Sequence, residues 1–484
     1  MADRMNVSFL QELLNSIAEQ GRQLLPRTFG GAAIGREDDI TELAAALSSN
    51  RGEASGVAIA RELLHRYRGL TREGRLDFLK YLARTMQPDP AEVTRAAKAY
   101  LSGPDAKTLR ALQRVVESPR LEFFRRLNLA PGATAEIVAM RRDLIATGDP
   151  SLAPLDSDLR HLLASWFNRG FLVLQRIDWR TSANILDKII AYEAVHTIHG
   201  WDDLRRRLDP ADRSCFAFFH PSLIDEPLIF VEVALMGDIP AAIGEVLDEA
   251  PKIDGAVGEP TTAVFYSISN CQEGLRGISF GNFLIKQVVE DLLKEHPSLN
   301  TFVTLSPVPG FADWLDAMLA GTEAARLVTP EERERLSVLS DPDWATSDAI
   351  SEALRPILLR LAAHYFLTEK AGDGRPLDPV ARFHLGNGAR LERINWLGDP
   401  SAKGQNTAHG LMVNYRYEIR DIERNHEAYA NDGVVAASRQ VHALLKRPKP
   451  RTDLVTGPTT TKLLRIARLR PPSKSPGEEQ PEGA

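Results

Sequence analysis

Apolar residues recur every three or four positions through about the first 170 residues, the spacing of one buried face of an α-helix. The run 7–25 shows this spacing most clearly, and residues at helix ends support it. Thr71 precedes a second apolar run, Pro90 fits a first helical turn, and Asp105 is placed to cap a third helix. The pattern predicts an all-helical domain at residues 1–160, either a bundle or a docking module.

The pattern changes after about residue 170, where short apolar runs rich in β-branched and aromatic residues predict strands. These runs cover residues 215–220, 227–235, 262–269, 301–305 and 411–418. Helical spacing returns between them at 281–296 and 351–367. Strands separated by helices favour an α/β or α+β domain with a central sheet, which we place at 161–448. The remaining residues, 449–484, form an extension whose end is too polar and proline-rich to order itself.

Composition excludes several classes of protein. A chain of 484 residues is too long for one ordinary core, and 43% apolar with 26% charged residues is typical of soluble globular proteins. The net charge of -6 argues against nucleic acid as a partner. No uncharged apolar run reaches the length of about 18 residues that a membrane helix needs. The 2 cysteines, without HExxH or CxxC spacing, predict neither a disulfide framework nor a metal site.

The ends of the chain favour a cytoplasmic location. Asp3, Glu12 and Glu19 make the first segment unlike a transit peptide, which is poor in acidic residues. The last four residues, Pro-Glu-Gly-Ala, are not a peroxisomal tripeptide. We therefore expect a cytoplasmic protein.

The segment SISNCQEGLRGISFGNFLIK reads as a strand, a glycine-rich loop and a helix. Gly274, Gly277 and Gly281 have no side chains, so backbone amides can approach an anion there, and the start of the helix adds unpaired N–H groups. The spacing matches neither a Walker motif nor the dinucleotide fingerprint GxGxxG. The loop is a plausible cradle for a pyrophosphate, and a simple tight turn is the competing interpretation.

Two polar residues stand out in the second half of the chain. Ser306 follows a predicted strand and precedes Pro307, which cannot donate to a sheet ladder, so we expect the strand to end there with the hydroxyl at the rim of the sheet. No GxSxG elbow surrounds Ser306, so it is not expected to form an acyl-enzyme. A partly buried His384 would titrate near neutrality and act as a general acid. The ordinary alternatives are a turn serine and a structural histidine.

Four strings resemble the malonyl-CoA decarboxylase family: FYSISNCQEGLRGISFGNFLIK, TLSPVPGFADWL, FHLGNGARLERINWLGD and GLMVNYRY. The resemblance extends over roughly residues 160–445 and continues more loosely into the helical part. It implies an α+β fold class, with an all-helical N-terminal domain followed by a mixed-sheet catalytic domain of the GNAT acetyltransferase fold. It also implies a homo-oligomer, a dimer or a tetramer.

The resemblance assigns two groups of residues. The catalytic candidates are Ser306, His384, Tyr417 and, for orientation, Asn387. The candidates for binding the coenzyme A pyrophosphate are Gly274, Leu275, Arg276, Gly277, Ile278, Ser279 and Gly281. Some members of the family carry a glutamate at the position of Ser279, so a catalytic carboxylate is not transferred to it.

The implied reaction converts malonyl-CoA, the small-molecule substrate, to acetyl-CoA and carbon dioxide. Loss of the carboxylate leaves a thioester enolate, which oriented donors stabilise and an acid protonates. His384 would be that acid or would relay the proton, and Ser306 would hold the malonyl carboxylate or polarise the departing group. No cofactor is expected, because the thioester itself delocalises the negative charge.

Two other functions stay open from the sequence. An acyltransferase of the same fold would move an acyl group from coenzyme A to an amine, and it would need a base and an acceptor groove. A non-catalytic binding module would use the helical domain as its working surface. Release of acetyl-CoA from malonyl-CoA without an acceptor would favour the decarboxylase.

Overall fold

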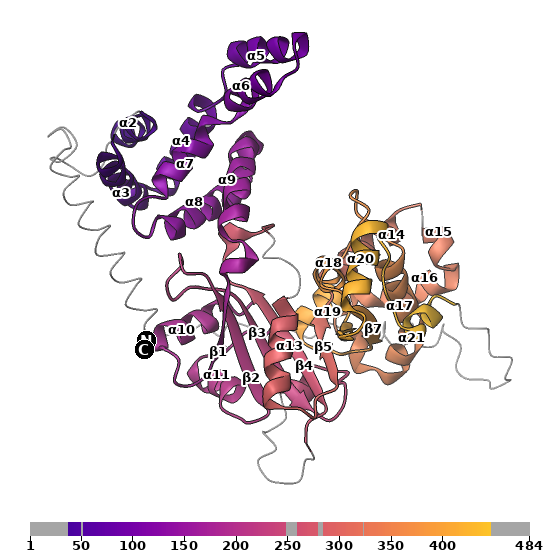
Figure 1. Ribbon diagram of the computed structural model, residues 1–484. Coiled ribbons are helices and arrows are strands. Elements are labelled where there is room, and N and C mark those ends of the chain that lie inside the picture. The colour runs from indigo at the N-terminus through magenta and orange to yellow at the C-terminus, as the bar shows by residue number, and fades with distance from the viewer. Residues whose placement is uncertain (1–36, 50–51, 248–258, 279–283, 323, 447–484) are drawn as a thin grey trace, which may run out of the picture. The chain divides into compact units, whose positions relative to one another are not determined.

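The computed structural model describes residues 37–49, 52–247, 259–278, 284–322 and 324–446 (Figure 1). The predicted helix at 7–25, the loop residues Ser279 and Gly281, and the extension 449–484 lie outside the described residues. The predicted domain boundaries at 160 and 448 stay predictions.

The first part of the chain is helical throughout the described residues, as predicted. Its helices are α2 (Glu37–Ser48), α3 (Glu53–Gly69), α4 (Arg72–Thr85), α5 (Pro90–Ser102), α6 (Ala106–Val116), α7 (Pro119–Leu127), α8 (Ala133–Thr147) and α9 (Ala153–Trp166), with the 3₁₀ turn η2 (Pro150–Leu152) before α9. The Thr71 hydroxyl accepts from the Gly74 N–H, and Asp105 forms a capping box with Thr108. The capping residues predicted from sequence are therefore confirmed.

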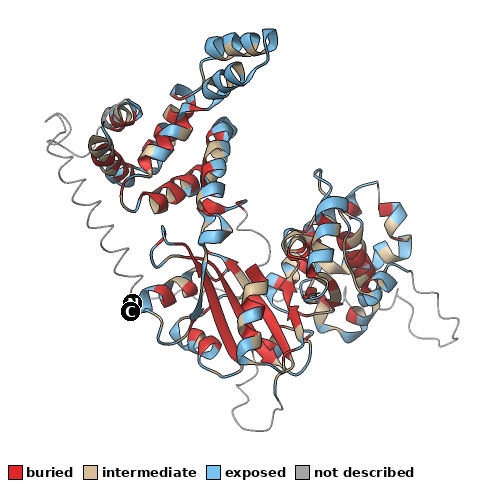
Figure 2. Cartoon of the chain, viewed as in Figure 1, coloured by how far each residue is buried: buried red, intermediate tan, exposed pale blue. Residues whose placement is uncertain are grey.

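Two of these helices differ from the rest in burial. Phe123, Phe124 and Leu127 of α7 are fully buried, whereas α5 and α6 contain no buried residue (Figure 2). Leu101 and Val116 are 76% and 50% exposed. The hairpin of α5 and α6 thus presents apolar side chains to solvent within the described chain.

The second part contains an eight-stranded mixed sheet. Its strands are β1 (Val173–Ile177), β2 (Arg213–Phe219), β3 (Pro227–Met236), β4 (Thr262–Asn270), β5 (Thr301–Thr304), β6 (Ser306–Pro307), β7 (Arg390–Asn395) and β8 (Met412–Arg416). The order is β1-β2-β3-β4-β5-β8-β6, with β7 paired to β8, and among these described strands only β4 and β5 pair in parallel. The five predicted strands are confirmed as β2, β3, β4, β5 and β8. The sequence patterns missed β1, β6 and β7.

Helices cover both faces of this sheet (Figure 1). Phe216 and Phe218 of β2 pack in the same cluster as the apolar face of α13 (Leu284–Glu295). Alternate residues of β2, such as Ala217, pack instead with α10 (Ala183–Tyr192) and α11 (Trp201–Leu208). The period of two along the strand explains why β2 is apolar at every position except its start.

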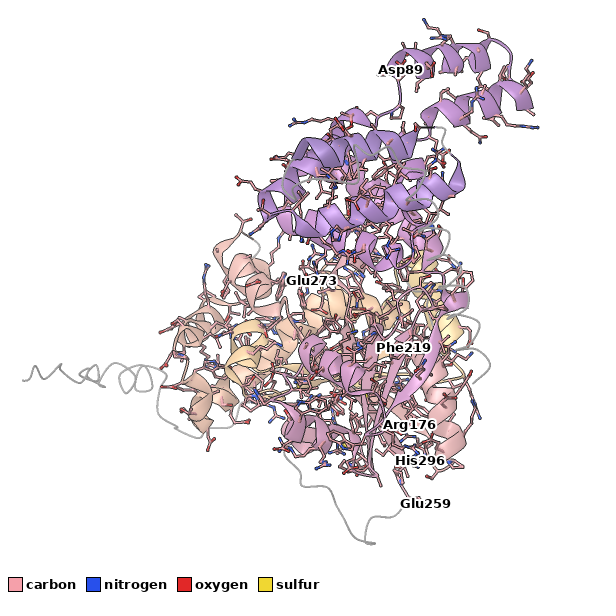
Figure 3. All side chains as sticks on the ribbon, turned by 90° about the vertical axis from the view of Figure 1, so that its left-hand side faces the viewer. Asp89, Arg176, Phe219, Glu259, Glu273 and His296 are labelled. Carbon is pink, nitrogen blue, oxygen red and sulfur yellow. The ribbon has the colours of Figure 1, made fainter. Side chains whose placement is uncertain are left out.

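An ion pair joins the outer strand β1 to α13. Arg176 forms an ion pair with Glu295 at the end of that helix, next to His296, which is labelled in Figure 3. Most of β1 is exposed or half-buried, so its sequence lacks the apolar run that would have predicted a strand.

The last part of the described chain is mainly helical and packs around β7 and β8. Its α-helices are α14 (Phe311–Ala320), α15 (Ala324–Leu327), α16 (Pro330–Leu336), α17 (Asp348–Leu367), α18 (Pro379–Gly386), α19 (Ala402–Ala408), α20 (Ile422–Asp432) and α21 (Arg439–Leu444). The helix predicted at 351–367 is confirmed as α17. Helix α18 was not predicted from the sequence, and it carries His384. No helix among the described residues is long and apolar enough to cross a membrane.

Candidate active site

Ser306 begins the short strand β6, which one residue, Leu305, separates from the end of β5. The predicted end of the strand at Ser306-Pro307 is confirmed, because β6 ends at Pro307, and Ser306 and Pro307 pair with Val413 and Met412 of β8. Proline is tolerated there because β6 pairs with β8 alone among the described strands, so its other side needs no ladder hydrogen bond. The Ser306 side chain, however, is buried rather than exposed at the rim of the sheet, because only 5% of the residue is accessible to solvent. Its Oγ donates to Thr304 Oγ1 at 2.8 Å.

His384 reaches Ser306 from the last turn of α18. The Nε2 atom of His384 lies 3.2 Å from Ser306 Oγ, and the Nδ1 atom lies 2.8 Å from the Tyr417 hydroxyl. The imidazole stacks on the Tyr415 ring, with centroids 4.6 Å apart and an interplanar angle of 25°. Ser306 and His384 are 78 positions apart in the chain. The structure thus brings together three of the four catalytic candidates.

Burial determines the charge of the imidazole. His384 is 3% exposed, and desolvation lowers its pKa from 6.5 to about 3. The expectation that this histidine titrates near neutrality is therefore wrong for the free protein, because burial disfavours the imidazolium. Burial also raises the pKa of Tyr417 well above its ordinary value, so its hydroxyl keeps its proton.

The hydrogen bonds around the neutral imidazole have one consistent direction. Thr304 Oγ1 accepts both the Ser306 hydroxyl and the Tyr415 N–H, which is 3.1 Å away. Since the Ser306 proton points to Thr304, Ser306 Oγ is left to accept from His384 Nε2–H. The Nδ1 atom is then an acceptor for the Tyr417 hydroxyl. This assignment gives a chain of donors from Tyr417 through His384 to Ser306.

Asp378 caps the start of the helix that carries His384, and it was missed by the sequence analysis. Its Oδ1 accepts from the Ala381 N–H at 2.7 Å and so caps α18, the helix that carries His384. The carboxyl group is 1% exposed, and burial raises its pKa from 3.8 to about 6. The dipeptide Asp378-Pro379 is a typical helix start, and it was the available signal.

A side-chain hydrogen bond of Asn387 goes to the backbone of α18 and not to Ser306, His384 or Tyr417. Its Nδ2 donates to the Phe383 carbonyl at 2.7 Å, and its backbone N–H caps the end of α18. The side chain is buried at the point where the chain leaves the helix. This geometry fits a residue that fixes the end of α18, and its role in orientation stays a prediction.

The glycine-rich loop begins with the 3₁₀ turn η4 (Glu273–Leu275), and its described residues end at Ile278. A Cβ atom at Gly274 would lie 2.0 Å from the Val138 carbonyl oxygen of α8, so close packing against α8 requires a glycine there. Gly277 has φ of +78°, a left-handed conformation that also favours glycine. Binding of a pyrophosphate by this loop stays a prediction.

Strand β4 has an open edge next to Ser306. Its last parallel pair with β5 is Phe265 with Thr304, and the Leu305 N–H donates to the Phe265 carbonyl at 3.0 Å. The register with β3 then skips Tyr266, which is the extra residue of a β-bulge. Beyond the bulge β4 continues to Asn270 without pairing to β5. The two strands therefore diverge at the catalytic candidates.

The buried side chain of Glu193 hydrogen-bonds the part of β4 that no longer pairs with β5. Glu193 accepts from the Ser267 and Ser269 hydroxyls at 2.7 Å and 3.2 Å, and from the Val195 and His196 N–H groups at 2.8 Å and 2.7 Å. Glu193 lies in the string YEAVH, which the sequence analysis did not assign to the site. No cluster of His, Cys, Asp and Glu side chains that could hold a metal ion occurs among the described residues.

Comparison with known proteins identifies the family. Residues 170–455 match the malonyl-CoA decarboxylase C-terminal domain, and residues 86–167 match the N-terminal domain of the same family. The chain belongs to the malonyl-CoA decarboxylase family. Among curated relatives, the goose (Anser anser anser) protein named mitochondrial malonyl-CoA decarboxylase is 37% identical over 413 residues, which are 78% of this chain and 82% of the relative. The mouse (Mus musculus) protein of that name is 38% identical and covers 67% of this chain and 70% of its own.

Solved structures of the family are also similar. Malonyl-CoA decarboxylase from Rhodopseudomonas palustris is 53% identical, with a TM-score of 0.81, and malonyl-CoA decarboxylase from Agrobacterium vitis is 55% identical, with a TM-score of 0.79. Each comparison covers 84% of this chain and 100% of the solved chain. The resemblance found in the sequence is confirmed, together with the α+β fold class, a helical part followed by a mixed-sheet domain.

Proposed function

We propose that Ser306, His384 and Tyr417 convert malonyl-CoA to acetyl-CoA and carbon dioxide through a thioester enolate that is then protonated. Membership of the family makes the chain a malonyl-CoA decarboxylase, a carboxy-lyase. The observation that carries the proposed mechanism is the 3.2 Å contact between Ser306 Oγ and His384 Nε2 in a buried setting.

The first task of the site is to stabilise negative charge as the carboxylate leaves. Hydrogen-bond donors aimed at the developing enolate oxygen contribute roughly 3 kcal/mol each in a site without water. The neutral His384 keeps Nε2–H as a donor, and the Ser306 hydroxyl can turn from Thr304 to the substrate. Ser306 then holds the malonyl carboxylate or polarises the thioester, as the resemblance implies.

The second task is to protonate the enolate carbon. A neutral imidazole has one proton to give, so giving it from Nε2 requires another proton to arrive at Nδ1. The Tyr417 hydroxyl is 2.8 Å from Nδ1 and is the donor placed to supply it. A thioester enolate is a far stronger base than a phenolate, so this transfer is downhill, and Tyr417 regains its proton from water afterwards. His384 therefore acts as a relay, and no cofactor takes part.

A direct experiment is to incubate the purified protein with malonyl-CoA alone and to follow acetyl-CoA. We expect acetyl-CoA to form without an added acceptor and to depend on Ser306 and His384. An acyltransferase would release no acetyl-CoA under these conditions. Full activity of both Ser306→Ala and His384→Asn would show that the chemistry occurs elsewhere.

We also propose a homo-oligomer and a cytoplasmic location. The apolar side chains exposed on α5 and α6 support self-association of the helical part, because monomeric proteins seldom expose contiguous apolar faces. Light scattering at micromolar concentration should give the mass of a dimer or tetramer, and the mass of a monomer would contradict this. Cell fractionation with a cytoplasmic and a membrane marker tests the location.

A further inference from the structure

The helical part of the chain contacts the glycine-rich loop through α8 and α9. Gly274 packs directly against the backbone of α8 at Val138. Arg141 of α8, with 2% of the residue exposed, donates from Nη1 to the Gly274 carbonyl at 2.7 Å and from Nε to Asp156 Oδ1 at 2.8 Å. Glu273, the first residue of η4, is labelled in Figure 3. The start of the loop is therefore fixed by a buried arginine of the helical part.

A second arginine reaches the other end of the described loop. Arg160 of α9 donates from Nη2 to the Gly277 carbonyl at 3.4 Å, a long hydrogen bond, and its side chain is exposed. Within the described ranges no ion pair is recorded for Arg160, whereas Arg141 is paired with Asp156. Two guanidinium groups thus donate to backbone carbonyl groups in the described part of the loop, 273–278.

We propose that the helical domain completes the coenzyme A site by holding this loop in place. Arg141 and Arg160 are positioning residues, since both contact the loop through its carbonyl groups. The positive charge of Arg160 also favours a diphosphate at the loop, whereas Asp156 compensates that of Arg141. The inference rests on the proposed function of the loop, which is to bind the pyrophosphate of the substrate. It gives the helical domain a part in substrate binding besides self-association.

Two substrates separate this role from a general loss of structure. Malonyl-CoA carries the nucleotide and its phosphates, whereas malonyl-pantetheine carries the same thioester without the diphosphate. For Arg160→Gln we expect KM for malonyl-CoA to rise about threefold to tenfold, with kcat changed by less than about twofold. KM for malonyl-pantetheine should stay at the wild-type value. Arg141→Lys keeps one donor and should show the same selective rise in KM.

A matched control is available on α7. Arg125 is a partly exposed arginine of the helical part that pairs with Glu117 at 2.7 Å, and no recorded contact joins it to the loop. Arg125→Gln should leave both KM values unchanged. Because Arg160 is exposed, Arg160→Gln is expected to fold normally even if Arg141→Lys loses stability, and thermal unfolding checks both.

Gly277→Ala distinguishes failure of this inference from failure of the proposed loop function. If Gly277→Ala raises KM only for malonyl-CoA while both arginine variants match the wild type, the loop binds the nucleotide but the helical domain does not position it. If Gly277→Ala folds and leaves KM unchanged, the loop does not bind the nucleotide and both proposals are wrong. An equal rise in KM for both substrates in the arginine variants would also overturn the inference.

Discussion

The neutral state of His384 leads to a specific prediction for the dependence of activity on pH. Desolvation lowers the pKa of His384 from 6.5 to about 3. Each pKa unit corresponds to about 1.4 kcal/mol, so the buried imidazolium is about 5 kcal/mol less favourable than it would be in water. At pH 5.5 only about 0.3% of the free enzyme would carry a charged His384.

We therefore expect kcat/KM for malonyl-CoA to show no histidine inflection between pH 5.5 and 8.5. This ratio reports ionisations of the free enzyme, which is the state that the structure describes. If a charged His384 with its ordinary pKa were required, kcat/KM would fall about tenfold for each pH unit above 6.5. A required neutral imidazole with that pKa would instead give about a tenfold loss at pH 5.5.

The assay is acetyl-CoA formation at limiting malonyl-CoA, in buffers of constant ionic strength. Asp378 needs a control, because its pKa of about 6 lies inside the range and it caps the helix of His384. The profile is therefore measured for the wild type and for Asp378→Asn. An inflection near pH 6.5 that disappears in Asp378→Asn would belong to Asp378. One that persists in Asp378→Asn would refute the neutral relay if it is also seen with malonyl-pantetheine, which lacks the 3′-phosphate that titrates at about pH 6.

Three further predictions follow from the same side chains. Ser306→Ala and His384→Asn should each lower kcat at least about a hundredfold, while the affinity for coenzyme A, measured by calorimetry, stays unchanged. Normal turnover in either variant would exclude the substituted residue from the mechanism. Tyr417→Phe removes the donor to Nδ1 and should lower kcat about tenfold with little change in KM, so wild-type kcat would exclude the relay. The stabilising contribution of Asp378 is fully present below pH 3.8 and is lost as pH rises through its raised pKa of about 6. In urea unfolding, Asp378→Asn should therefore be about 3 kcal/mol more stable than the wild type at pH 8 and less than about 1 kcal/mol more stable at pH 4. A stability difference that does not change with pH would contradict the raised pKa of Asp378.

The sequence predicted those elements whose own residues carry the signal. The start of α4 follows from Thr71 and that of α6 from Asp105, because side-chain caps act within one turn. The strands β3 and β4 were predicted because helices cover both of their faces, so nearly every position is buried and the apolar runs are long. By contrast β7 (RLERIN) has its apolar residues Leu391 and Ile394 three positions apart, because a β-bulge interrupts its pairing with β8, so the period of two is lost.

The site itself could be predicted only in part. Ser306, His384 and Tyr417 were found through the family resemblance, and neither spacing nor composition shows that positions 78 residues apart would meet. The error in the ionisation of His384 has a physical cause. The string FHLGNG suggests a half-buried ring before a bend, whereas α18 places the ring against Tyr415 and excludes water. Burial depends on tertiary packing, so the pKa could not be predicted from neighbours in the sequence.

The register of β8 determines whether the catalytic side chains meet. Val413 of β8 pairs with Ser306, and the Tyr415 N–H donates to Thr304 Oγ1. Just beyond the strand, the Tyr417 N–H donates to the Phe302 carbonyl at 2.8 Å. Alternate side chains of a strand point to opposite faces, so Tyr415 and Tyr417 share the face that His384 contacts. A slip of one residue would turn both tyrosines to the other face and would remove the stacking and the phenol together. The catalytic geometry is therefore set by strand pairing, and α18 needs only to bring one imidazole onto a surface that β8 has already arranged.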